Sequence, residues 1–256
     1  MIDARAIIAD GAKLASDVEV GPFTVIGPEV EIGPGCWIGP HAVITGRTSM
    51  GAGNKVFQFA SIGEVPQDKK YTGIPTRLTI GARNVFREGC TINRGASPDR
   101  GVTSIGDDNL FMACTHVAHD CILGSRIVMV NYAGLAGHVE LGDWVILSGY
   151  VGVHQFVKIG MHAFVANNGA VTRDVPPYVM AVGQPAVPHS INIEGLKRRG
   201  FTPEQIRNLR NAYRVLYRSE LSLTAAVEQL AGLVAQQPEL QPLLQFIAQS
   251  DRSLIR

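Results

Sequence analysis

The chain has few cysteines, almost no excess of charge of either sign and no long apolar run. Its four cysteines, Cys36, Cys90, Cys114 and Cys121, show no paired Cys-x-x-Cys spacing, which argues against a disulfide framework and against a zinc finger. A formal net charge of +1 over 256 residues argues against nucleic acid as the main partner. No apolar run approaches the length of a membrane span, and the N-terminus lacks a basic segment followed by an apolar core. We therefore expect a cytoplasmic protein without stable membrane insertion.

Apolar residues recur at every sixth position through most of residues 2–171. A first run covers 2–62, a second covers 80–92, and a third, shifted by one residue across a loop, covers 105–171. A period of six fits neither an α-helix nor an alternating strand, and it is typical of a parallel β-helix with one short strand and one turn per repeat. We predict a mainly β fold, a left-handed parallel β-helix (the hand of known hexapeptide proteins) shaped as a triangular prism over residues 1–190.

The repeat length predicts which residues stack on one another. Three repeats make one coil of 18 residues, so residues 18 apart should lie in neighbouring coils, about 4.8 Å from each other. The periodic apolar residue should point inward, and the glycine that often follows it, as at Gly21 and Gly124, should permit a left-handed backbone at the corner. Interruptions at 63–79 and 96–102 predict two projecting loops, which are either binding loops or solvated insertions.

Prolines between residues 174 and 188 predict the end of the prism, and a helical pattern follows over 191–256. Thr202, Pro203 and Gln205 form the pattern of a capping box with proline at the first helical position. Apolar residues at three- and four-residue steps then predict an amphipathic helix, a second helix near 224–236 and a third beginning near Pro238. We expect a small C-terminal helical domain.

Four of the seven histidines fall in one stretch of chain: His116, His119, His138 and His154. The 18-residue rule places His119, Gly137 and Gln155 in one column. The histidine ring would then lie beside a glycine N–H that can bind an oxyanion, and Asp120 could orient the ring. Histidine is the usual general base at neutral pH, and no Ser or Cys on this face has the surroundings of a nucleophile. The pattern favours direct transfer to a bound acceptor, with a surface histidine of no catalytic role as the alternative.

A zinc site is the competing interpretation of the histidines. Three histidines on neighbouring coils can bind zinc and leave one position open, but His116, His119 and His138 would have to converge. Their offsets from the inward-pointing residues differ, so their directions should diverge, and we predict no metal. His41, His162 and His189 are interpreted as solvated or structural.

Five stretches of the sequence carry a resemblance to a known family. They are HVAHDC (116–121), LAGHVELGDW (135–144), VHQF (153–156), DVPPYV (174–179) and NIEGLKRRGF (192–201). With these stretches, essentially the whole chain resembles the UDP-N-acetylglucosamine acyltransferases that begin lipid A synthesis in Gram-negative bacteria. The last stretch is the most specific, because many hexapeptide transferases share the prism without it.

The resemblance implies a reaction and its catalytic residues. An (R)-3-hydroxyacyl group would pass from the phosphopantetheine thioester of acyl carrier protein to the 3-hydroxyl of UDP-N-acetylglucosamine. In the family's pattern His119 is the base, Asp120 orients it and the N–H of Gly137 is the oxyanion donor. The pantetheine arm arrives on the carrier, so no cofactor of the chain itself is expected.

The resemblance also implies substrate-binding residues. These are Asp68 and Lys70 for the sugar; His116, His138, His154 and Gln155 along the sugar and pantetheine path; and Asn192, Glu194, Arg198 and Arg199 for nucleotide, phosphate and carrier. Arginine suits phosphate because its planar fork donates two parallel hydrogen bonds. The alternative for 197–199 is an ordinary basic start of a helix.

Further expectations concern assembly and chain length. The resemblance implies a homotrimer with sites between adjacent prisms, and the first loop could come from the neighbouring subunit. Because acyl carrier protein is acidic, a basic patch is expected, with Arg173 and Lys197–Arg199 as candidates. Asn167 stands where long-chain members carry glycine at the end of the acyl groove. Each excluded methylene loses about 0.8 kcal/mol, so we expect a shorter acyl chain of around ten to twelve carbons.

Other functions remain open. The acceptor could carry an amine in place of the 3-hydroxyl, or the chain could be a non-catalytic hexapeptide scaffold. The related enzyme that N-acylates glucosamine is disfavoured, because it carries an extra N-terminal domain whereas the repeats here begin at Ile2.

Overall fold

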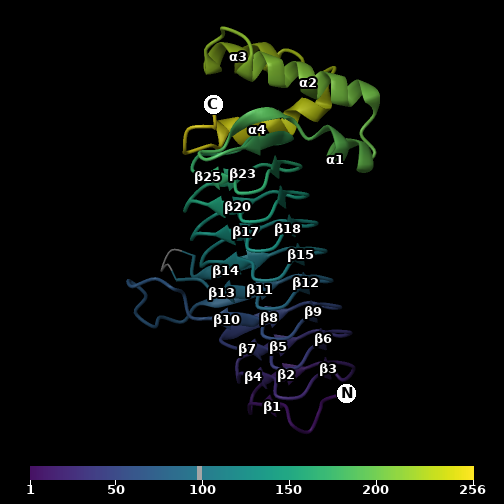
Figure 1. Cartoon of the computed structure of the whole chain (residues 1–256), viewed down its shortest axis with the longest axis vertical. Coiled ribbons are helices and arrows are strands. Elements are labelled where there is room, and N and C mark those ends of the chain that lie inside the picture. The colour runs from purple at the N-terminus through teal and green to yellow at the C-terminus, as the bar shows by residue number, and fades with distance from the viewer. Residues whose placement is uncertain (97–99) are drawn as a thin grey trace.

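The chain forms a three-sided prism of short strands that is closed at one end by helices (Figure 1). The computed structural model describes residues 1–96 and 100–256. From β1 to β25, successive strands enter three sheets in turn, and neighbouring strands of one sheet pair in parallel from coil to coil. With residues 18 apart in register, as His116 is with Gly134, the prism is the predicted left-handed parallel β-helix.

The three sheets form the walls of the prism. Sheet 1 contains β1 (Ile7–Ile8), β4 (Val25–Ile26), β7 (Val43–Ile44), β10 (Ser61–Glu64), β13 (Thr91–Asn93), β16 (His116–Val117), β19 (Gly134–Leu135), β22 (Gly152–Val153) and β25 (Ala170–Val171). Sheet 2 contains β2 (Lys13–Leu14), β5 (Glu31–Ile32), β8 (Arg47–Met50), β11 (Arg77–Ile80), β14 (Val102–Ile105), β17 (Ile122–Leu123), β20 (Glu140–Leu141) and β23 (Lys158–Ile159). Sheet 3 contains β3 (Glu19–Val20), β6 (Trp37–Ile38), β9 (Lys55–Val56), β12 (Val85–Phe86), β15 (Leu110–Phe111), β18 (Val128–Met129), β21 (Ile146–Leu147), β24 (Phe164–Val165), β26 (Val179–Val182) and β27 (Val187–Ile191).

The periodic apolar residues fill the interior of the prism. From Val20 to Val171 they are buried, and the largest that are fully enclosed include Phe86 and Phe111, whose rings stack with centroids 4.9 Å apart. Complete burial of one such side chain contributes roughly 1.5–3 kcal/mol, so the repeat itself supplies the driving force for coiling. The first coil is the exception, because none of the described residues covers its open end and Ile2 remains 49% exposed.

The predicted role of the glycines is wrong. Apart from Gly63, whose φ is 82°, the glycines that directly follow a periodic residue do not have a positive φ; the left-handed residue usually comes two positions after the glycine position and is often not glycine, as at His41, Asp120 and His138. The glycines are instead required by the close approach of the next coil. A Cβ on Gly21 would lie 2.7 Å from the backbone nitrogen of Pro40, and one on Gly142 would lie 2.6 Å from that of Met161.

Both predicted loops leave the prism on the same side (Figure 1). The first connects β10 to β11 through residues 65–76. It is shorter than the predicted 63–79, because β10 and β11 extend into both ends of that range. The second connects β13 to β14 through residues 94–101, and residues 97–99 within it lie outside the described part.

The C-terminal helices close the end of the prism that is remote from the N-terminus (Figure 1). Strand β27 runs antiparallel to β26 and ends at Ile191, so pairing continues past the prolines that were expected to end it. The helices are α1 (Ile193–Arg198), α2 (Pro203–Tyr217), α3 (Leu223–Ala231), the 3₁₀ turn η1 (Pro238–Leu240) and α4 (Gln241–Ala248). The capping box at Thr202 and Gln205 is confirmed. Within the described residues no helix combines the length and apolarity needed to cross a membrane.

Candidate active site

A cavity of about 560 Å³ lies on the edge of the prism where sheet 1 passes into sheet 2. This first edge carries the left-handed residues Asp120, His138 and Phe156 in successive coils. The cavity is lined by Gln67, Asp68, Lys70, Tyr71, Ala96, His119, His138, Gln155 and Phe156. Five of the residues expected in the site, Asp68, Lys70, His119, His138 and Gln155, therefore meet around one space within a single chain.

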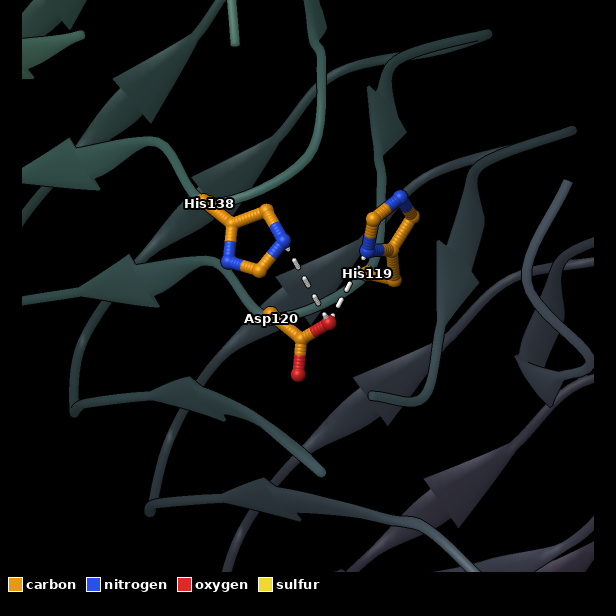
Figure 2. A group of neighbouring side chains, drawn as sticks. All are labelled: His119, Asp120 and His138. Atoms are coloured by element: carbon orange, nitrogen blue, oxygen red, sulfur yellow. Dashed lines mark hydrogen bonds and ion pairs between the residues drawn. The ribbon is translucent and has the colours of Figure 1, made fainter. Parts of the chain in front are cut away.

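The ring of His119 is oriented by the carboxylate of Asp120 (Figure 2). The distance from Nδ1 of His119 to Oδ2 of Asp120 is 2.9 Å, and Asp120 is fully buried whereas the His119 side chain is 16% exposed. A carboxylate can only accept, so Nδ1 carries the proton and Nε2 of the neutral ring keeps its lone pair. Figure 2 shows the second ring nitrogen pointing away from Asp120. This is the tautomer that a general base requires.

Asp120 is itself held from several directions. Its Oδ2 accepts a hydrogen bond from the backbone nitrogen of Ala96 at 2.9 Å, and its own backbone N–H donates to Oγ1 of Thr103. Its φ of 58° lies in the left-handed region, which a residue other than glycine occupies only when its surroundings hold it there. The second loop, through Ala96, and strand β14, through Thr103, together fix the carboxylate beneath the ring.

Gly137 lies directly against the ring of His119, as the 18-residue spacing predicted. A Cβ placed on Gly137 would lie 2.5 Å from Cε1 and 2.7 Å from Nε2 of His119. No acceptor within the described residues takes the backbone N–H of Gly137. An unpaired backbone N–H on a residue that lies against the base is the kind of donor that can stabilise an oxyanion formed next to it.

His138 packs over the same carboxylate from the next coil. Its Nε2 lies 3.9 Å from Oδ2 of Asp120, and its ring is nearly perpendicular to that of His119, at 89° with centroids 5.2 Å apart (Figure 2). On its other side it stacks on Phe156 with centroids 4.5 Å apart. Phe156 therefore forms both a wall of the cavity and the support of His138.

His116 faces outward from β16, beside the first edge. Its Nδ1 lies 2.8 Å from Oγ1 of Thr91 in the preceding coil. Burial, and then the nearby His119, lower the pKa of His116 below its usual value, so the ring favours the neutral form.

The zinc alternative required His116, His119 and His138 to converge. The described residues instead bring together the potential ligand atoms of His119, Asp120 and His138, all within 4.8 Å of one another. In that group the Oδ2 of Asp120 already accepts from the Ala96 backbone and lies within hydrogen-bonding distance of His119, which suits an orienting carboxylate. The prediction that the chain needs no metal stays a prediction.

The residues expected to bind the nucleotide lie on a different edge. Asn192 is the N-cap of α1: its Oδ1 accepts from the backbone of Gly195 at 3.1 Å, and its Nδ2 donates to the carbonyl of His162 at 3.0 Å. Arg199, just after α1, places its guanidinium 5.0 Å from the ring centre of Trp144. Glu194 and Arg198 lie on α1 itself, and none of these four residues lines the cavity of the first edge.

His162 organises this second edge, where sheet 2 passes into sheet 3. Its Nδ1 accepts from Arg199 at 3.1 Å, and its ring lies between those of Trp144 and Tyr178. Burial, and then the Arg199 charge, lower the pKa of His162 to about 4, so the ring is neutral and can accept. From the sequence we expected His162 to be structural or solvated; its ring is buried, and it contacts both Asn192 and Arg199.

The two remaining expected residues lie outside the cavity. His154 is exposed, next to Gln155 on the first edge. Asn167 is exposed on the third edge, between β24 and β25, where sheet 3 passes into sheet 1.

Sequence reasoning missed residues whose partners are distant in the chain. Phe156 and Trp144 each end one of the five family stretches but were given no role, and Thr91 lies in none of the stretches. Phe156 follows His138 by 18 positions, and Trp144 precedes His162 by 18, so the coil arithmetic could have paired each with its histidine. Thr91 pairs with His116 across 25 positions, because the second loop lengthens that coil, and no fixed period would have found it.

Comparison with known proteins gives the same relatives over the whole chain. Residues 174–255 match the family model described as Udp N-acetylglucosamine O-acyltransferase, domain 2. The acyl-[acyl-carrier-protein]–UDP-N-acetylglucosamine O-acyltransferases of Thiobacillus denitrificans and Stutzerimonas stutzeri are 54% and 50% identical, over 100% of this chain and 99% of each relative. The crystal structure of the UDP-N-acetylglucosamine O-acyltransferase from Moraxella catarrhalis is 42% identical, superposes with a TM-score of 0.98, and is covered over 99% of its length by 100% of this chain. The chain belongs to the family of acyl-[acyl-carrier-protein]–UDP-N-acetylglucosamine O-acyltransferases, the acyltransferases that act at the first step of lipid A synthesis.

Proposed function

We propose that this acyltransferase moves an (R)-3-hydroxyacyl group from acyl carrier protein to the 3-hydroxyl of UDP-N-acetylglucosamine by direct attack. Nε2 of His119 removes the proton from the acceptor hydroxyl as its oxygen attacks the thioester carbonyl. The C–O bond forms, the carbonyl oxygen becomes an oxyanion, and collapse of this intermediate breaks the C–S bond. The proton held by the imidazolium then passes to the leaving thiolate of the pantetheine arm.

The observation that carries this proposal is the position of Gly137 against the His119 ring. An oxyanion must form within hydrogen-bonding distance of a donor and close to the base; Gly137 lies against the His119 ring, and the ring itself lines the cavity. The charge that develops on the ring is compensated by Asp120 at 2.9 Å. One oxyanion donor is worth about 10²–10³ in kcat in other enzymes.

We further propose that the working enzyme is a homotrimer whose sites form between adjacent prisms. The support is the division of the expected residues: the base is on the first edge, whereas α1 and Arg199 are on the second edge of the same chain. A neighbouring copy that placed its second edge against the first edge of this chain would complete the site. Asp68 and Lys70 need not come from a neighbouring copy, because the first loop of the same chain reaches the cavity.

The reaction is tested by an acyl-transfer assay with product masses measured. Purified protein is offered UDP-N-acetylglucosamine, or its 3-amino analogue, together with 3-hydroxyacyl carrier proteins of graded chain length. An ester product with the hydroxyl acceptor supports the proposal. Amide product alone favours the amino sugar, and no product with either acceptor favours the scaffold alternative.

A further inference from the structure

The C-terminal tail, residues 249–256, folds back onto the prism next to the first edge. Nζ of Lys158, on β23, donates to the carbonyl of Gln249 and to Oδ2 of Asp251, both at 2.9 Å. The backbone nitrogen of Ile255 donates to the carbonyl of Asp174 at 2.9 Å, and the side chain of Ile255 is buried. The tail is therefore fixed on both sides of residue 252.

Arg252 extends from this fixed segment to the first edge. Its guanidinium nitrogen Nη1 lies 3.1 Å from Nδ1 of His154 and donates to the carbonyl oxygen of Gln155. Gln155 lines the cavity that contains His119. The tail thus delivers a cation to the rim of the candidate active site from a position almost 100 residues away in sequence.

The charge of Arg252 is not compensated by any carboxylate within the described residues. None of their ion pairs includes Arg252, and the neighbouring Asp251 is engaged by Lys158. Both contacts of Arg252 are made by the same nitrogen, whereas a guanidinium carries five N–H donors. The remaining donors form a planar fork that matches two oxygens of a phosphoryl group.

We propose that Arg252 binds a phosphoryl group of a substrate at the rim of the first edge, an inference that rests on the proposed acyl transfer. Gln155 is two coils beyond His119, about 10 Å along the prism by the strand spacing. An anion at Arg252 would therefore lie well outside the reacting atoms. Two phosphoryl groups could occupy this place: the phosphodiester of the pantetheine arm and the diphosphate of the sugar nucleotide.

The test compares Arg252→Gln and Arg252→Lys with the wild type and with Arg210→Gln, which removes an exposed arginine of α2. Donors are matched acyl-pantetheine and acyl-phosphopantetheine thioesters, which differ only in the phosphate. Equilibrium binding of phosphopantetheine, pantetheine and UDP is measured as well, because binding does not require turnover. Failure of the proposed acyl transfer would appear in the wild type, whereas failure of this inference appears only in the comparison of variants.

If Arg252 binds the pantetheine phosphate, Arg252→Gln weakens binding of the phosphorylated donor about tenfold or more and leaves binding of the dephosphorylated donor unchanged. If it binds the diphosphate, the loss falls on UDP and on the KM for the sugar nucleotide. Arg252→Lys should recover part of either loss, because it keeps the charge without the fork. Equal losses with both donors and unchanged UDP binding would mean that Arg252 only supports His154 and Gln155, and would overturn the proposal. The proposal would also be overturned if all binding and kinetic constants of Arg252→Gln lay within twofold of those of Arg210→Gln.

Discussion

The first and second edges of the prism stack ring side chains in the same way but use them differently. On the first edge His138 and Phe156 stack beside a cavity, and the base nitrogen of His119 points away from its supporting carboxylate. On the second edge His162 is buried and its ring nitrogen accepts from Arg199. The first edge leaves its reactive groups available to a substrate, whereas on the second edge the histidine is used to hold α1 and Arg199 in place.

This difference shows what the scaffold contributes to each edge. A hexapeptide coil places a left-handed residue at most of its corners, so stacking alone does not make a site. The first edge can be a catalytic site for two reasons. Two loops interrupt the repeat beside it and enclose a cavity, and a buried carboxylate follows the histidine in sequence. The second edge becomes a support at Trp144 and His162, because Asn192 and Arg199 of the C-terminal part contact it there.

The largest expected effect comes from removing the charge that orients the base. Asp120→Asn offers the His119 ring an amide in place of a carboxylate, so Nδ1 can become the acceptor and Nε2 then carries the proton. We expect kcat to fall about 10³-fold or more, by analogy with histidine–carboxylate pairs elsewhere. Steady-state kinetics measure this.

The matched control for Asp120→Asn is Asp143→Asn. Asp143 is a carboxylate of the second edge that accepts from the backbone nitrogen of Ser125 at 2.8 Å. Its loss should leave kcat within about twofold of the wild type. Equal losses in the two variants would mean that Asp120 matters only for folding.

A methyl group on Gly137 tests the oxyanion donor and the base together. In Gly137→Ala the new Cβ would lie 2.5 Å from Cε1 of His119, so the ring must leave its present position. We expect kcat to fall about 10²–10³-fold. Gly232→Ala is the control, because its Cβ would meet nothing closer than 3.6 Å. Full activity in Gly137→Ala would exclude the arrangement proposed for the oxyanion.

The second edge should respond to pH through stability. Burial, and then Arg199, lower the pKa of His162 to about 4 from an ordinary value of 6.5, so between these values the unfolded chain binds more protons than the folded one. Stability is therefore fully present above pH 6.5 and falls as the pH decreases toward 4, by up to about 3 kcal/mol. Chemical denaturation at a series of pH values measures the slope.

His162→Gln should remove most of that slope, because the glutamine does not titrate. His41→Gln, at an exposed histidine of the third edge, should leave the slope as in the wild type. A wild-type slope that persists in His162→Gln would assign the acid sensitivity to another group.

The smallest expected effect concerns the third edge. Asn167→Gly should lengthen the preferred acyl chain, since each additional methylene that becomes buried gains about 0.8 kcal/mol, roughly fourfold in relative rate. Competition between carrier proteins of graded chain length measures the ratio. An unchanged preference would remove Asn167 from the account of chain length.

The period of the sequence predicted most of the prism because one interaction, burial of the sixth residue, sets both register and direction. Sheets, inward residues and the neighbours of His119 all followed from it, and the fold class and the family are confirmed. The glycine interpretation was wrong because close contact between coils, rather than a left-handed backbone, requires the missing Cβ. Roles of individual site residues stay predictions.

Contacts between residues whose separation does not follow the 18-residue coil could not be predicted. His162 meets Arg199 across 37 positions, and Arg252 meets His154 across 98. Both depend on how the helical segment folds back on the prism, and burial periodicity within either part carries no information about that docking. Spacing also could not show that α1 lies on a different edge from His119.

The most direct test of the central claim is single-turnover acyl transfer by His119→Ala beside His41→Ala, with product mass detected. Both variants lose one histidine from an edge of the prism, but only His119 lies in the cavity and faces an orienting carboxylate. We expect His119→Ala to lower the rate of product formation at least about 10²-fold, whereas the rate of His41→Ala stays near that of the wild type. A His119→Ala rate within a few-fold of the wild type would contradict the assignment of the base, and with it the proposed mechanism.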